Sequence, residues 1–127
     1  MKYFLFLDDE RLPSAGATHH GFDAIFIARS VVVAKEIMMC HDKSNVEWFL
    51  SLDHDLGENQ STGKDFVNWL VSVDMNYPRY DFFNRMDIFV HSQNCVGVQN
   101  MLSYLASYRR ERVKGNVISR NKFATLV

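Results

Sequence analysis

The chain has 127 residues, of which 47% are hydrophobic and 23% charged, and this balance predicts one globular domain over residues 1–127. A formal net charge of −1 gives no general attraction to DNA or to a membrane surface, so neither partner is expected. No apolar run approaches the roughly 20 residues of a transmembrane helix. The run at residues 3–7 is interrupted too early for a signal peptide. Cys40 and Cys95 lie far apart without metal-binding spacing, which indicates a reducing, cytoplasmic setting.

Four short apolar runs are predicted to be buried strands, because each is too brief for a helix and is bounded by polar residues. They are residues 3–7, 22–28, 48–52 and 86–90. Helical spacing of apolar residues predicts three helices, over residues 31–41, over 62–65 to 76–78, and over 95 to about 112. The expected N-terminal caps are Ser30, Thr62 with Asp65, and Asn94. Met38 and Met39 are expected to pack in the core.

The alternation of strands and helices with short connections favours a parallel α/β sheet of four to five strands. Residues 8–23 show no helical stripe, so the first crossover is either irregular or contains a short hidden turn. Residues 116–119 form either a fifth, edge strand or an irregular arm. From Arg109 onward, six basic residues accompany one acid, which indicates either a solvated helix end or a surface for RNA or another phosphate-rich ligand.

Polar side chains follow three of the predicted strands directly. Residues 8–11 read Asp-Asp-Glu-Arg, residues 53–55 read Asp-His-Asp, and residues 91–94 read His-Ser-Gln-Asn. Because side chains alternate along a strand, Asp53 and Asp55 should point one way and His54 the other. Ligands of open parallel sheets bind outside the carboxyl ends of the strands. The coincidence of three such ends predicts a ligand site, whereas the residue 53–55 motif alone could equally be a solvated turn.

Three motifs carry a family resemblance: FLDDERLP at residues 6–13, SLDHDLG at 51–57 and HSQNCVG at 91–97. Together they resemble the receiver-like family called the cyclic-phosphate-processing receiver domain, over residues 4 to about 105. The resemblance implies a flavodoxin-like, receiver-like sheet in which the first, third and fourth strands are adjacent and the second lies at the edge. It also implies processing or binding of a cyclic phosphate on a nucleotide or an RNA end. Such domains can be phage-encoded, which would imply an anti-defence or RNA-repair context.

The strand-end carboxylates suit a divalent cation. The candidate metal ligands are Asp8, Asp9, Asp53 and Asp55. Their charges would repel one another strongly without a cation or bound protons. Because carboxylate oxygens are hard ligands, Mg²⁺ or Mn²⁺ is the expected cofactor, with Ca²⁺ as a further candidate.

The remaining strand-end residues suit phosphate chemistry. His54, His91 and Asp53 are the candidate catalytic residues, since an imidazole pKa near 6.5 suits general acid–base catalysis. His91 is expected to face the start of the last helix, where a phosphate would sit. The candidate substrate-binding residues are Arg11, Arg29, Ser92 and Asn94.

Three functions therefore compete. The leading one is a metal-dependent phosphoesterase acting on a cyclic phosphate. The second is a non-catalytic protein that binds cyclic nucleotide or phosphate and so sequesters or senses it. The third, a divergent phosphoacceptor receiver, is the least favoured, because signalling receivers carry a lysine after the fifth strand and only Arg120 or Lys122 could serve here.

Overall fold

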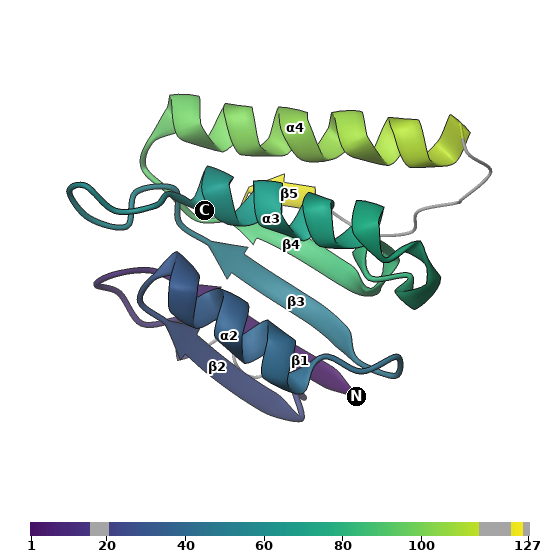
Figure 1. Ribbon diagram of the computed structural model, residues 1–127. Helices are drawn as coiled ribbons and strands as arrows, with labels where there is room; N and C mark the ends of the chain where they lie inside the picture. The colour runs from purple at the N-terminus through teal and green to yellow at the C-terminus, as the bar shows by residue number, and fades with distance from the viewer. Residues whose placement is uncertain (16–20, 115–122, 126–127) are drawn as a thin grey trace.

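The sheet at the centre of the molecule has five parallel strands. The computed structural model describes residues 1–15, 21–114 and 123–125. The strands are β1 (Lys2–Leu7), β2 (Ala24–Ala28), β3 (Glu47–Leu52), β4 (Met86–Val90) and β5 (Phe123–Thr125), in the spatial order β2-β1-β3-β4-β5 (Figure 1). This arrangement confirms the parallel α/β fold, the predicted adjacency of β1, β3 and β4, and the place of β2 at the edge.

Three long helices lie on one face of this sheet (Figure 1). They are α2 (Val31–His41), α3 (Gly63–Asn76) and α4 (Cys95–Lys114). The steps β2 to β3, β3 to β4 and β4 to β5 all run in the same direction across the sheet. Because parallel crossovers are right-handed, three steps in one direction put their helices on the same side. None of the helices among the described residues is long and apolar enough to span a membrane.

The predicted helix caps are confirmed. The Ser30 hydroxyl accepts from the backbone N–H of Val33 at 3.3 Å. Thr62 and Asp65 form a reciprocal capping box at the start of α3. The side-chain oxygen of Asn94 accepts from the backbone N–H of Gly97 at 2.9 Å. These bonds satisfy N–H groups that have no partner within the helix, so each helix starts at a defined residue.

The core lies between the helices and the sheet. Leu5, Leu7, Trp48, Leu50 and Ile88 are fully buried there, as expected for strands covered by helices. Met38 joins this core, but the prediction for Met39 is wrong, because its side chain is 74% exposed. Met38 and Met39 are neighbours on α2 and point about 100° apart, so only one of them can face the sheet.

The described end of the connection from β1 to β2 lies on the other face of the sheet, as expected for a step in the opposite direction from the later crossovers. Near its end, the ring of Phe22 packs at 5.1 Å from both Phe4 and Phe49. Residues 16–20 of this connection are outside the described part of the chain, and so is the arm or strand predicted at residues 116–119. The fifth strand that the structure does describe is β5, which pairs with β4 from Phe123 onward.

A buried ion pair fastens α4 to α3. Arg112 donates to both carboxylate oxygens of Asp74, at 2.7 and 3.2 Å. Asp74 also accepts from the backbone N–H of Phe83 at 3.0 Å and from the hydroxyl of Tyr108. Burial, reinforced by this carboxylate, raises the pKa of Tyr108 to about 12. Arg112 is therefore a structural residue, which corrects its assignment to a solvated or ligand-binding basic tail.

Candidate functional site

Asp8, Asp53 and His91 lie side by side at the carboxyl edge of the sheet. Each backbone N–H continues the strand ladder: Asp8 donates to Ala28 at 3.1 Å, Asp53 to Leu7 at 2.9 Å and His91 to Leu52 at 2.9 Å. The residues just before them on their strands point into the helix-covered core. Since side chains alternate, Asp8, Asp53 and His91 all project from the opposite side of the sheet. The sequence prediction that Asp8 and Asp53 share one edge is confirmed.

Asp8 is buried and fully hydrogen-bonded. Its Oδ1 accepts from the backbone N–H groups of Glu10 and Arg11, at 2.9 and 2.8 Å. Its Oδ2 contacts Nε of Arg11 and Nε2 of His91, each at 3.0 Å. Burial by itself would raise the pKa of Asp8, but these bonds and the charge of Arg11 outweigh burial and lower the pKa. Asp8 is therefore held as a carboxylate.

Asp53 is also buried, with 6% of its surface exposed, but it has fewer partners. A hydrogen bond with Ser92 favours its charged form, and Nη2 of Arg11 lies 3.7 Å from its Oδ2. Burial and the neighbouring charge of Asp8 outweigh these contacts and raise the pKa of Asp53. A carboxylate in this state gains strongly from a bound cation.

Asp8, Asp9 and Asp53 form a group that can hold a metal ion. Each offers one carboxylate oxygen, and these oxygens all lie within 4.8 Å of one another. Three hard oxygen donors at this spacing fit Mg²⁺, Mn²⁺ or Ca²⁺. Asp55, a fourth predicted ligand, is not part of this group. Its carboxylate is turned toward His54, at 2.8 Å, and toward the amide of Asn94, at 3.2 and 3.3 Å.

The metal-ligand group opens into a polar pocket of about 630 Å³. Its lining includes the predicted phosphate-binding residues Arg11, Ser92 and Asn94. Arg29, predicted for the same role, is not in the lining. Its guanidinium donates to the backbone carbonyls of Asp8, at 3.0 Å, and Arg11. Arg29 thus braces the main chain under the pocket.

His54 lies outside the pocket lining, as the alternation along the strand end predicted. Its ring packs against the first turn of α4, where a Cβ on Gly97 would come within 2.5 Å of the ring. Its Nδ1 is 2.8 Å from Asp55 and 3.4 Å from the amide of Asn94. In this arrangement His54 anchors α4 to the end of β3, and a direct catalytic role stays a prediction.

His91 does not face the start of α4, so that prediction is wrong. Its ring lies flat on Phe6, with centroids 4.5 Å apart, and its Nε2 and Nδ1 contact Asp8 at 3.0 Å and Ser51 at 2.6 Å. On β3, Ser51 pairs with Phe6 of β1 and Phe89 of β4, and its small side chain leaves room for the ring of His91 to lie over it and reach Asp8. Burial outweighs the favourable carboxylates and lowers the pKa of His91. In the neutral ring, both nitrogens are occupied by hydrogen bonds within the protein, Nδ1 with Ser51 and Nε2 with Asp8.

Ser51 was missed by sequence reasoning. It was grouped with the apolar run of β3, yet it is a buried hydroxyl that orients the ring of His91. A signal was present: Ser51 is the one hydroxyl within residues 48–52, and it precedes Asp53 by two residues, on the same side of the strand.

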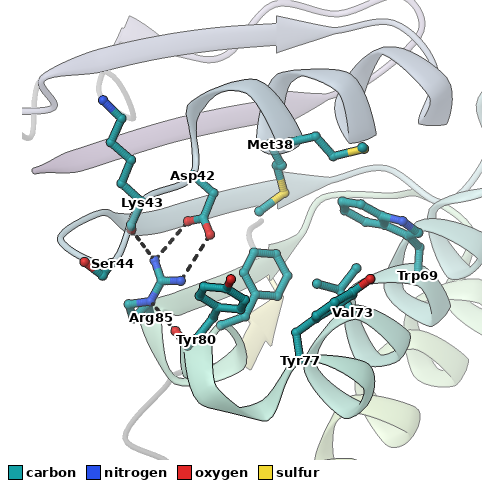
Figure 2. A pocket seen from close by; sticks show the side chains of 11 residues that line it. Met38, Asp42, Lys43, Ser44, Trp69, Val73, Tyr77, Tyr80 and Arg85 are labelled. Atoms are coloured by element: carbon teal, nitrogen blue, oxygen red, sulfur yellow. Dashed lines mark hydrogen bonds and ion pairs between the residues drawn. The ribbon is translucent and has the colours of Figure 1, made fainter.

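A second pocket, also about 630 Å³, lies at the opposite end of the sheet, between α2, α3 and the connection from α3 to β4 (Figure 2). Aromatic and thioether side chains dominate it, among them Met38, Trp69, Tyr77, Tyr80 and Phe82. Arg85, on its wall, is bound to both oxygens of Asp42, at 2.9 and 3.1 Å. Because Arg85 and Asp42 are paired with each other and Asp42 is the single carboxylate among the described lining residues, this pocket does not resemble the strand-edge site.

Comparison with known proteins identifies a family for this chain. The sequence model of the cyclic-phosphate processing receiver domain matches residues 3–107. No curated protein and no solved structure matches the chain. The matched span includes β1 from Tyr3 onward, β2 to β4, and every residue of the strand-edge site described above. The chain belongs to the cyclic-phosphate processing receiver domain family.

Proposed function

We propose that this protein is a metal-dependent phosphoesterase that processes a cyclic phosphate on a nucleotide or an RNA end. The observation that carries the proposal is the group of Asp8, Asp9 and Asp53 at the mouth of a polar pocket, in a chain whose family is associated with cyclic-phosphate processing. Three carboxylates so close together are stable as anions only beside positive charge. A phosphate with a divalent ion satisfies the carboxylates and the cationic and amide donors of the pocket together.

The proposed roles follow from the contacts. Asp8, Asp9 and Asp53 would hold the ion, which when bound supplies positive charge opposite the charge that develops on a phosphoryl oxygen. The neutral donors of Ser92 and Asn94 line the same pocket and would orient the phosphate. Opening a cyclic phosphate adds one water to phosphorus, breaks one ring P–O bond and moves a proton to the leaving oxygen.

A carboxylate is better placed than an imidazole to move that proton. Neither His54 nor His91 lines the pocket among the described residues, whereas Asp9, Glu10 and Asp53 do. We therefore assign His91 a positioning role through Asp8. His91→Ala tests this assignment: a change of metal affinity that accompanies the change of turnover supports positioning through Asp8. A loss of turnover by roughly 100-fold or more at unchanged metal affinity would restore His91 as the general acid or base.

A non-catalytic binding protein is the second candidate. The inward placement of His54 and His91 favours it, because the described lining of the pocket then contains no free imidazole, the commonest acid–base group. The phosphoacceptor alternative depends on a lysine after the fifth strand. The two candidates, Arg120 and Lys122, precede β5 in the chain and lie outside the described residues. The cytoplasmic setting and a phage context stay predictions from the sequence.

A ligand panel separates the two leading functions. The protein would be incubated with cyclic mono-, di- and trinucleotides and with 2′,3′-cyclic phosphate ends, with Mg²⁺ or Mn²⁺ and with a chelator. We expect turnover that requires metal and is lost in Asp53→Asn. Glu58→Gln, an exposed acid outside the metal-ligand group, is the matched control and should retain activity. Retention of a ligand without turnover would favour the binding protein. If the protein neither turned over nor retained any ligand, both candidate functions would be contradicted.

A further inference from the structure

The guanidinium of Arg11 lies beside two of the candidate metal ligands, Asp8 and Asp53. Its Nε is 3.0 Å from Oδ2 of Asp8, and its Nη2 is 3.7 Å from Oδ2 of Asp53. The same Nη2 donates to the backbone carbonyl of His91 at 3.2 Å. Arg11 thus bridges two of the three carboxylates that would ligate a metal ion.

Asp8 has no hydrogen-bonding capacity to spare for an additional ligand. Its two oxygens already meet four N–H donors, two from the backbone of Glu10 and Arg11 and two from the side chains of Arg11 and His91. A carboxylate offers about four lone-pair sites in all. A metal ion that binds through Asp8 must therefore replace one of these donors.

Arg11 is the donor that can leave. The two backbone N–H groups belong to the turn that follows β1. The side chain of His91 is only 12% exposed and is held by Ser51 and Phe6. By contrast, 50% of the Arg11 side chain is exposed. This side chain lines the polar pocket, so it has open space into which it can move.

We propose that Arg11 is an internal counter-ion that competes with the divalent ion for Asp8 and Asp53, so that metal binding requires its release. This inference rests on the metal site of the proposed function. In the metal-free protein the guanidinium offsets part of the charge repulsion between the two aspartates. Once released into the pocket, it becomes available for the phosphate contact that the sequence predicts for it.

Competition has a measurable sign. Removing Arg11 removes a charge-assisted contact that stabilises only the metal-free state, so metal affinity should rise. Contacts of this kind are strong enough to change a binding constant by roughly 10-fold. If Arg11 instead supported the ion from nearby, or had no effect on it, its removal would weaken binding or leave it unchanged.

The test is a calorimetric titration of Mn²⁺ into the wild type, Arg11→Ala and Lys64→Ala. Lys64 is the matched control: it loses one positive charge beside the site, but its amine contacts Asn68 at 2.8 Å and the ring of Tyr104, not a carboxylate of the group. We expect Arg11→Ala to bind Mn²⁺ roughly 10-fold more tightly than the wild type, and Lys64→Ala to stay within about twofold.

Thermal unfolding gives a second readout, and Arg11→Gln a second variant that keeps most of the side-chain length. For both Arg11 variants, the metal-free melting temperature should fall and the rise caused by saturating Mn²⁺ should exceed that of the wild type. Equal or weaker Mn²⁺ binding by the Arg11 variants would overturn the competition while leaving the metal site intact. Absence of binding in every variant would overturn the metal site as well, and binding by the Arg11 variants alone would show that Arg11 blocks the site.

Discussion

Asp74 and Asp53 are both buried aspartates, with 2% and 6% of their surface exposed, yet their surroundings differ in kind. Asp74 lies between α3 and α4 and accepts two bonds from Arg112, one from the backbone of Phe83 and one from Tyr108. Asp53 lies at the open edge of the sheet beside Asp8, with Ser92 and a half-exposed arginine as partners. Burial of a carboxylate is common to a structural ion pair and to a candidate site. The two kinds of site differ in the hydrogen-bonding and ionic partners of the carboxylate.

The largest expected effect concerns the structural pair. Arg112→Ala leaves the buried carboxylate of Asp74 without its cation, which should lower the free energy of unfolding by about 3–5 kcal/mol. Urea denaturation measures the loss. Arg110→Ala is the control, because Arg110 is exposed and its guanidinium donates to the hydroxyl of Ser107 on the same helix. That control should change stability by about 0.5 kcal/mol or less. Equal losses in the two variants would contradict the assignment.

Gly63→Ala should disturb the site through the backbone of Asp53. A Cβ at this position would lie 2.1 Å from the backbone carbonyl oxygen of Asp53, which a side-chain rotation cannot relieve. Overpacking of this kind should cost about 1–3 kcal/mol of stability, and displacement of Asp53 should weaken Mn²⁺ binding. Lys64→Ala, one residue along α3, should do neither. Retention of wild-type metal affinity in Gly63→Ala would show that the position of Asp53 is less constrained than this contact indicates.

Asp53→Asn should have the opposite effect on stability, raising the free energy of unfolding of the metal-free protein. Because burial raises the folded-state pKa of Asp53, ionisation of this group costs stability as pH rises from 3.8 through the folded value. At neutral pH the substitution should therefore stabilise the metal-free protein, by roughly 0.5–2 kcal/mol, while abolishing metal binding. Asp55→Asn should not be stabilising, since its hydrogen bond with His54 lowers the pKa of Asp55. A metal-free protein destabilised by Asp53→Asn would break the contrast with Asp74.

The smallest effect is a pH dependence. Burial lowers the folded-state pKa of His91 from 6.5, so its contribution to stability is present above pH 6.5 and is lost as pH falls toward the folded value. In the Asp53→Asn background, which removes the opposing titration, adding His91→Asn should reduce the loss of stability between pH 7 and 5 by on the order of 1 kcal/mol. Identical pH profiles with and without His91 would contradict a buried, neutral imidazole.

The sequence alone determined the parallel α/β architecture, the strand order implied by the family motifs, and the helix caps. The architecture and the caps depend on local signals: apolar runs of strand length, helical spacing, and capping residues such as Ser30, Thr62 and Asn94. The strand order was implied by the resemblance of three motifs to the family. The convergence of Asp8, Asp9 and Asp53 was also predictable, because the carboxyl ends of adjacent parallel strands must meet at one edge.

Only the tertiary structure decided how the side chains at that edge are used. Alternation places His91 on the same side as Asp53, but the small volume of Ser51 on the neighbouring strand lets the ring cross to Asp8 instead of facing α4. Arg11 and Arg112 are both arginines near a polar or basic stretch of sequence, yet one bridges the candidate site and the other neutralises Asp74 in the interior. Apart from the pair of Arg11 with Asp8, which are three residues apart, the contacts that decide these outcomes join residues 38 to 83 positions apart. Contacts between residues so distant along the chain leave no periodic or local signal in the sequence.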